Sequence, residues 1–382
     1  MDKSWCKIAH VITESQPFGG AQRNTLLTLK GLVQHGYCAE LVCGPGGPLI
    51  PKAQALGVPV HVIPELVRQV APWRDYRAFL RLYQLFRSRA YHVVHTHSTK
   101  AGFLGRLAAR WARVPGIVHT FHGVPFEMNG DWKSKLYITL ERYVGSFSHD
   151  LACVGELLRQ EVSAWQIAPA EKLVTIYSGI DFSNYTPQRT ADETKRLLGV
   201  EGAWPIIGSI GRLSEQKAQH YLVEAVAVLR KRYAHLQLLL VGEGERRSLL
   251  EKRIQTLGLS SQVSLLGERD DIPDLLNIFD IYVMSSLWEG VGRALTEAMY
   301  WGLPIVATPV NGVKELIVQE ETGLLVPPRD PVALAAAIDR VVSDRALAQR
   351  LGANAQEKAQ ELMDGQRMIM ALEELYERLK GQ

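Results

Sequence analysis

The chain has 382 residues, of which 47% are hydrophobic and 22% are charged, and its formal net charge is +3. This length predicts two domains, each large enough for its own core, and the composition excludes a disordered chain. No apolar run approaches the roughly 18–20 residues that a membrane-spanning helix requires, so we expect no such helix.

The charge is distributed unevenly along the chain. Residues 1–183 carry 20 basic and 13 acidic residues and nine of the eleven histidines, whereas the remainder is acidic overall. A basic N-terminal half suits an anionic partner, but a solvated basic surface explains it equally well. The acidic second half and the lack of a recognisable binding module argue against nucleic acid. The four cysteines lack metal-ligand spacing, and we expect them to be buried free thiols.

Short apolar strands alternate with helical patterns in the first half. This alternation predicts a parallel sheet with helices on both faces. The expected strands are 6–12, 39–43, 58–63, 93–96, 117–121, 151–154 and 173–176, and the clearest helices are 21–34, 75–89 and 100–113. After residue 181 the regular pattern is lost until about Pro205.

Two loops at the carboxyl ends of these strands are candidate ligand contacts, because open α/β sheets bind ligands at that edge. Gly19-Gly20 follows the first strand and could bring backbone amides close to a phosphate or sugar, or could simply form a tight turn. His122 follows the strand 117–121, and His95 and His97 end the preceding strand. We do not expect a zinc site from these histidines, because no carboxylate or thiol pattern accompanies them.

The helices expected at 75–89 and 100–113 are rich in arginine, with aromatic residues interleaved. Such helices can lie against anionic lipid headgroups. Alternatively, the aromatic residues pack in the core and the arginines face water, which we favour.

The second half repeats the alternation and predicts a second α/β domain. Its expected strands are 206–210, 236–241, 263–266, 281–284 and 305–308, and its expected helices are 221–233, 246–257, 272–279, 293–300, 331–343, 345–362 and 365–380. Arg212 and Lys217 follow the first of these strands, where a guanidinium fork and a compact ammonium suit phosphate oxygens. Asp270 or Asp271 is expected to cap the helix that starts near Ile272.

The stretch 285–302 carries two carboxylates, Glu289 and Glu297, on either side of a helix start. Val291 and Gly292 lie before the helix that begins at Arg293, so free backbone amides there could bind a phosphate. Glu289 is placed to accept hydrogen bonds from sugar hydroxyls, and Glu297 to meet another part of the same ligand. The alternative is that Glu289 is a capping acid and Glu297 an exposed helix residue.

Several motifs resemble one large family. These are FGGAQRN at 18–24, HTFHG at 119–123, GRLSEQK at 211–217, the E-x7-E spacing followed by EAMYWGLPIVAT, and ETGLLVPPRDP at 321–331. In this order they resemble the retaining nucleotide-sugar glycosyltransferases of family 4, with the GT-B fold. The resemblance implies two Rossmann-like, doubly wound parallel-sheet domains with an interdomain cleft. We place an acceptor-binding domain at 1–183, with a terminal crossover helix at 365–382, and a donor-binding domain at 184–364.

The resemblance also implies roles for individual residues. Arg212 and Lys217 would hold the donor diphosphate, Glu289 the sugar hydroxyls and Glu297 the ribose. His122 would lie beside the donor sugar. Gly20, Arg269, Val291, Gly292 and Arg293 complete the expected donor contacts, Arg269 against the base.

The implied reaction moves a sugar, with retention, from a nucleoside diphosphate sugar, with UDP expected, to a hydroxyl of a glycan or lipid-linked acceptor. This is expected in cell-surface polysaccharide synthesis, in the cytoplasm or at the inner face of its membrane. No metal and no cofactor beyond the donor are expected. The alternatives are a nucleotide-sugar epimerase or phosphorylase of the same fold, or a non-catalytic nucleotide-sugar-binding protein.

Overall fold

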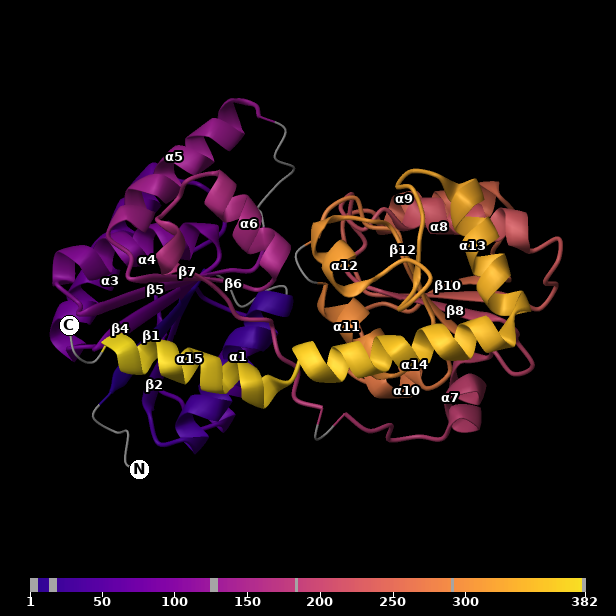
Figure 1. Cartoon of the computed structure of the whole chain (residues 1–382), viewed down its shortest axis with the longest axis horizontal. Coiled ribbons are helices and arrows are strands. Elements are labelled where there is room, and N and C mark those ends of the chain that lie inside the picture. The colour runs from indigo at the N-terminus through magenta and orange to yellow at the C-terminus, as the bar shows by residue number, and fades with distance from the viewer. Residues whose placement is uncertain (1–5, 14–18, 124–129, 183–184, 290–291, 380–382) are drawn as a thin grey trace. The chain divides into compact units, whose positions relative to one another are not determined.

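The computed structural model describes residues 6–13, 19–123, 130–182, 185–289 and 292–379 (Figure 1). The chain divides into two compact units. The N-terminal unit comprises Met1–Asp181 and Met363–Gln382, and the second unit comprises Phe182–Leu362. From the sequence, the chain was predicted to pass from the first domain to the second between residues 183 and 184, and back to the first between residues 364 and 365.

The N-terminal unit contains a seven-stranded parallel sheet in the order β3-β2-β1-β4-β5-β6-β7. Its strands are β1 (Lys7–Ile12), β2 (Cys38–Cys43), β3 (Val60–Val62), β4 (Val93–His97), β5 (Gly116–Phe121), β6 (Asp150–Cys153) and β7 (Leu173–Thr175). Its α-helices are α1 (Gly20–Gln34), α2 (Leu49–Ala55), α3 (Pro72–Arg89), α4 (Thr99–Ala112), α5 (Trp132–Ser146), α6 (Glu156–Ala164) and α15 (Gly365–Arg378). The strand order reverses direction at β1 and β4, as in a doubly wound fold.

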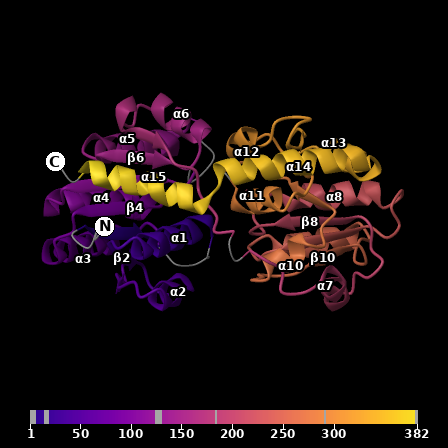
Figure 2. The same cartoon turned by 60° about the horizontal axis from the view of Figure 1, so that its bottom comes forward.

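The two faces of this sheet have separate cores. Side chains that alternate along the strands, such as Ile8 and Val93, pack with α1 and α15 on one face. Their neighbours Ala9 and Val94 pack with α3 and α4 on the other. The terminal helix α15 therefore belongs to the N-terminal unit, and Figure 2 shows it alongside α1.

Helix α1 also fastens the segment that leaves the unit. The buried Asn24 donates to the Ser178 hydroxyl over 2.8 Å and to the Met368 sulfur of α15 over 3.1 Å. Lys30 forms an ion pair with Asp181 at 2.6 Å. These contacts give Ser178 a structural partner in the FGGAQRN motif.

The second unit contains a six-stranded parallel sheet in the order β10-β9-β8-β11-β12-β13. Its strands are β8 (Ile206–Ile210), β9 (Gln237–Val241), β10 (Val263–Leu265), β11 (Ile281–Met284), β12 (Ile305–Ala307) and β13 (Leu324–Leu325). Its helices are α7 (Ala191–Leu198), α8 (Gln219–Leu229), α9 (Arg247–Thr256), α10 (Ile272–Leu276), α11 (Arg293–Tyr300), α12 (Asn311–Leu316), α13 (Pro331–Ser343) and α14 (Arg345–Leu362). The reversal here lies at β8 and β11, so the predicted pair of doubly wound sheets is confirmed.

Several local expectations were wrong. Residues 191–198 form α7, because Thr190 and Glu193 build a capping box that starts a helix where the sequence suggested no regular structure. Asp271 occupies the N-cap position of α10, but its side chain makes no capping bond and pairs with Arg269 instead. Three cysteines are buried as expected, whereas Cys38 is exposed at the start of β2.

The arginine-rich helices α3 and α4 mostly follow the favoured alternative. Phe86 is buried and Phe79 is partly buried in the core that α3 shares with α4, while most of the arginines face solvent. Arg106 is the exception, because its side chain is fully buried and pairs with Glu141 of α5 at 2.6 Å. Trp111 is the opposite exception, since 63% of it is exposed.

Candidate functional site

In the second unit, the loop after β8 and the loop after β11 are joined directly. The backbone amide of Leu287 donates to the Gln216 carbonyl over 2.7 Å, and the Gln216 side chain donates to the Trp288 carbonyl over 2.9 Å. The buried Ser285 hydroxyl donates to the Lys217 carbonyl over 3.0 Å. These bonds place the GRLSEQK motif against the start of the E-x7-E motif, as adjacent strands at a switch point allow.

Lys217 and Glu289 form an ion pair at this junction. The Lys217 ammonium donates to Glu289 Oε1, and the Ser286 hydroxyl donates to the same oxygen over 3.1 Å. The exposed fractions of the two side chains are 18% and 8%. Gly211 makes room for this lysine, because a Cβ at that position would stand 3.0 Å from Lys217 Cε. The arrangement presents one ammonium, already oriented by a carboxylate, at the carboxyl edge of the sheet.

Helix α11 places the second carboxylate. Gly292 is its N-cap residue, with a left-handed φ of 71° that a residue without Cβ adopts readily. Glu297 is 5% exposed and accepts from Arg293 Nε over 2.9 Å. Glu297 is therefore not an exposed helix residue, and Glu289 is not a first-turn capping acid, so both alternatives are wrong. Val291 lies outside the described residues.

The other two predicted cations differ in how firmly they are held. Arg212 follows β8, its side chain is 39% exposed, and its Nε lies 3.9 Å from Glu245 Oε2. Arg269 is held by Asp271 through two bonds of 2.8 and 2.6 Å. This pairing lowers the pKa of Asp271 below its usual value. Arg212 is thus the less constrained of the two for an incoming anion.

In the N-terminal unit, Gly20 is the first residue of α1 and Gly19 is its N-cap, so this pair opens a helix. The Gln22 side chain accepts from the Gly19 amide over 3.2 Å. His122 follows β5 and is partly buried, and its Nε2 lies 3.0 Å from His97 Nδ1. Burial lowers the pKa of His122 to about 4, so its ring is neutral near pH 7.

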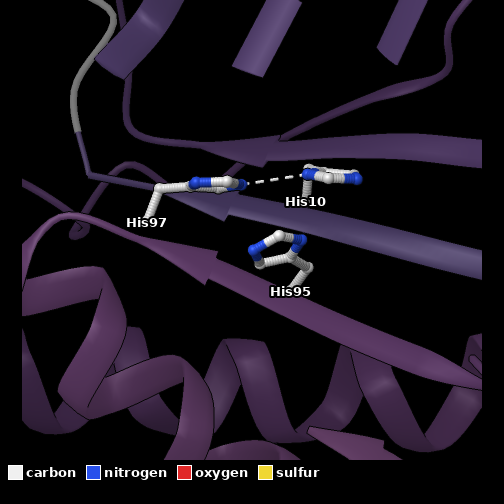
Figure 3. Close-up of side chains that lie close together, drawn as sticks. All are labelled: His10, His95 and His97. Atoms are coloured by element: carbon white, nitrogen blue, oxygen red, sulfur yellow. Dashed lines mark hydrogen bonds between the residues drawn. The ribbon is translucent and has the colours of Figure 1, made fainter. Parts of the chain in front are cut away.

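Three histidines gather more closely than their spacing suggested. His10 of β1 and His95 and His97 of β4 each direct a ring nitrogen to a common region, where the nitrogens lie within 4.8 Å of one another (Figure 3). All three rings are buried, and the His10 and His97 rings are hydrogen-bonded over 3.0 Å. Among the described residues, no carboxylate or thiol joins this group. A metal ion there would have to break that bond without a compensating negative charge.

The residues that hold the two loops of the site together were not predicted from the sequence. Gln216 lies in the GRLSEQK motif and Ser285 lies just before the E-x7-E motif, but neither residue type at its position indicates a hydrogen bond between the two loops. The buried Ser214 hydroxyl in the same motif has no partner within the described part of the chain.

Comparison with known proteins agrees with this architecture. Residues 19–179 match the glycosyl transferase 4-like domain, and residues 191–358 match glycosyl transferases group 1. The chain is 32% identical to the Escherichia coli UDP-Gal:alpha-D-GlcNAc-diphosphoundecaprenol alpha-1,3-galactosyltransferase, over 89% of each chain. It is 25% identical to the Staphylococcus aureus capsular polysaccharide biosynthesis glycosyltransferase CapM, over 83% of this chain and 84% of CapM.

Solved structures show the same fold. Anabaena HepE in complex with UDP and glucose has a TM-score of 0.85 at 23% identity, covering 98% of this chain and all of HepE. WaaG, a glycosyltransferase involved in lipopolysaccharide biosynthesis, has a TM-score of 0.75 at 17% identity, covering 98% of this chain and all of WaaG. The motif order, the paired doubly wound sheets and the full-length relative agree: the chain belongs to the group 1 glycosyltransferases and has the GT-B fold.

Proposed function

We propose that this glycosyltransferase moves a sugar from a UDP-sugar to a hydroxyl of a lipid-linked glycan, with retention of anomeric configuration. The ion pair of Lys217 with Glu289, fastened beside the start of α11, carries the proposal. The E. coli relative uses UDP-galactose and a diphosphoundecaprenol-linked acceptor, and HepE binds UDP and glucose. Both support this donor class, and the former supports a lipid-linked acceptor.

The proposed chemistry depends on fixed positive charge. When the glycosidic bond to the diphosphate breaks, negative charge develops on the leaving phosphate. Lys217, Arg212 and the backbone amides at Gly292 and Arg293 are proposed to stabilise that charge. Glu289 orients the Lys217 ammonium and accepts from the sugar hydroxyls, while Glu297 accepts from the ribose. We assign His122 and Gly20 to the sugar and the diphosphate, and Arg269 to the base.

Retention is proposed to follow from attack on the face that the leaving group occupies. Glycosidases place carboxylates on both sides of the bond, and no residue is assigned here as a nucleophile. The leaving phosphate then takes the proton of the acceptor hydroxyl. With two cations and a helix terminus at the diphosphate, we propose that the reaction needs no metal.

The direct test is product analysis. The protein is incubated with UDP-galactose, UDP-glucose or UDP-N-acetylglucosamine, with and without an undecaprenyl-diphosphate sugar as acceptor. We expect one donor to raise the melting temperature most and to give an acceptor-dependent product whose anomeric proton shows the donor's configuration. EDTA should leave turnover unchanged. An inverted anomer contradicts retention, loss of turnover in EDTA contradicts the metal-free proposal, and donor conversion without acceptor favours an epimerase.

We further propose that α5 lies on the anionic membrane that carries the acceptor. None of the described helices is long and apolar enough to cross a bilayer. Trp132, Leu136, Leu140 and Tyr143 nevertheless form an exposed apolar stripe on α5, with exposed fractions of 69%, 50%, 40% and 56%. Residues spaced by three and four lie on one helix face.

The basic residues beside this stripe favour an anionic lipid surface as its partner. The exposed charged residues within α5 are Lys133, Lys135 and Arg142, all basic, because the acidic Glu141 is buried against Arg106. Tyr143 also borders a hollow of about 530 Å³ lined by Trp111, Arg110 and Arg113 of the α4 end. Aromatic and basic side chains together are typical of interfacial lipid binding. From the sequence, lipid contact was an open alternative for α3 and α4, for which packing in the core was favoured, and α5 was not considered.

Vesicle co-sedimentation tests the membrane contact. We expect the protein to bind phosphatidylglycerol vesicles more tightly than phosphatidylcholine vesicles. The double variant Trp132→Ser/Leu136→Ser should weaken binding by about tenfold or more, because it removes two exposed apolar side chains that the proposed membrane contact buries. Met370→Ser is the matched control, since Met370 is 56% exposed on α15 of the same unit. Equal binding by the wild type and the double variant contradicts the proposal.

A further inference from the structure

A continuous hydrogen-bonded chain of side chains runs inward from His122 through the N-terminal unit. His122 Nε2 meets His97 Nδ1 at 3.0 Å, and His97 Nε2 meets His10 Nδ1 at 3.0 Å. His10 Nε2 lies 3.5 Å from the Tyr376 hydroxyl, which meets His95 Nδ1 at 2.5 Å. The chain ends where His95 Nε2 meets the Thr120 hydroxyl at 2.7 Å.

The fold explains why these groups meet. His95 and His97 are two residues apart on β4 and therefore point to the same sheet face. His10 of β1 lies opposite His95, and Thr120 of β5 lies opposite His97. This face is the one that α15 covers, and α15 supplies Tyr376. Figure 3 shows the His10 and His97 rings joined by a bond, with His95 beside them.

All four rings are neutral near pH 7. Burial lowers the pKa of His10 to about 3 and of His122 to about 4, and lowers the pKa of His95 and His97 well below the usual value. Burial also raises the pKa of Tyr376, which stays protonated. The other titratable groups near this hydrogen-bonded chain are Cys6, Tyr37 and Glu373 around Tyr376, and His119 with its neighbour Arg106 on the opposite face of the sheet.

All hydrogen bonds in a row of neutral imidazoles must run in the same direction. Each ring has one N–H to donate and one lone pair to accept with. Tyr376 sets the direction. Its contact with His95 is the shorter of its two, and a phenol is a stronger donor than acceptor, so its O–H points to His95 Nδ1. His10 then donates to Tyr376, His97 donates to His10, and His122 donates Nε2–H to His97.

We infer that Tyr376, through His10 and His97, fixes His122 as the Nε2–H tautomer and leaves its Nδ1 as a lone-pair acceptor. Nδ1 of His122 has no partner among the described residues, so it is available to a ligand. A lone pair there accepts a hydrogen bond from the O–H of a sugar hydroxyl, whereas the other tautomer can only donate an N–H to the hydroxyl oxygen. The sugar as ligand rests on the proposed function, but the tautomer does not. Tyr376 and His97 are thus positioning residues for His122.

Nitrogen-15 NMR of the full chain labelled at histidine tests the inference. His122→Asn identifies the His122 signals. We expect the wild type to show His122 with a protonated Nε2 and an unprotonated Nδ1, the Nε2–H form dominating by about tenfold, the bias that one hydrogen bond supplies. Tyr376→Phe removes the hydroxyl that sets the direction of these hydrogen bonds, and it should bring the two His122 tautomers toward equal populations. Thr120→Val, at the far end, should shift them in the same direction.

Tyr91→Phe is the matched control. Tyr91 is buried in the core on the other face of the same sheet, and its hydroxyl donates to Glu40 over 2.5 Å, so the His122 tautomer should not change. We expect Tyr376→Phe to lower kcat by about twofold, in proportion to the population lost, and Tyr91→Phe to leave it unchanged. A protonated Nδ1 in the wild type, or an unchanged tautomer in Tyr376→Phe, overturns the inference. The NMR readout needs no turnover, so its outcome stands even if the proposed reaction fails.

Discussion

We expect Lys217→Ala to lower kcat by about 10²–10³-fold, comparable to removing one oxyanion donor from a preorganised site. Glu289 holds the lysine in place, so its charge would need little reorganisation as the proposed diphosphate leaves. The effect should fall mainly on kcat, because the interaction strengthens as negative charge develops. Steady-state kinetics with saturating donor and acceptor measures this. Lys252→Ala, at an exposed position on α9, is the control and should retain wild-type rates.

The rate loss of Lys217→Ala could also come from leaving the Glu289 carboxylate unpaired. One further variant distinguishes this explanation from the loss of the lysine charge. Lys217→Ala leaves Glu289, which is only 8% exposed, without its cationic partner beside the proposed position of the diphosphate. If the loss came only from that unpaired carboxylate, the double variant Lys217→Ala/Glu289→Gln would recover most of the rate. We expect it to stay as slow as the single variant or slower. Recovery to within tenfold of the wild type would remove Lys217 from its proposed role.

The largest stability effect is expected at the buried pair of Arg106 and Glu141. Both side chains are essentially inaccessible, at 0% and 2%, and their 2.6 Å contact joins α4 to α5. Glu141→Ala leaves a buried guanidinium without its counter-charge, and this should lower the free energy of unfolding by about 3–5 kcal/mol. Urea denaturation followed by tryptophan fluorescence checks the value. Arg196→Gln, which breaks an exposed pair with Glu201 at 3.7 Å, should cost less than about 1 kcal/mol.

A double replacement decides whether the pair stabilises the fold. The variant Arg106→Met/Glu141→Leu keeps similar volumes and removes both charges. We expect it to be close to the wild type in stability or above it, because the desolvation cost of two charges disappears with them. A double variant as unstable as Glu141→Ala would show that the pair is a net stabilising interaction. Since α5 carries the proposed membrane stripe, the same variants should be checked for vesicle binding.

Much of the fold was readable from local patterns. Apolar runs such as 206–210 and 281–284 match β8 and β11 to the residue, because strands buried on both faces are continuous hydrophobic segments. Helix α7 was missed, since its apolar content is low and a capping box, not periodicity, marks its start. The two-residue strand β13 is too short to carry any alternation.

The residues of the candidate site could be predicted from the sequence, but the contacts between their side chains could not. The position after a strand predicted that Arg212, Lys217 and His122 lie at the carboxyl edges of their sheets, because parallel strands end on one side. The pairing of Lys217 with Glu289 spans 72 residues, and that of Arg269 with Asp271 diverts the residue expected to cap α10. Neither choice of partner is encoded by spacing alone.

The sequence by itself determined the alternation of strands and helices, the positions of the motifs, and the family to which they belong. Only the tertiary structure decided which polar groups meet. His10, His95, His97 and Tyr376 come from three elements up to 366 residues apart, and they form one hydrogen-bonded chain because the order of the strands and the return of α15 bring them to a single face. The physical reason is that periodicity reports which face a side chain occupies, whereas a hydrogen bond requires donor and acceptor atoms within about 3.5 Å, which the packing of distant segments alone provides.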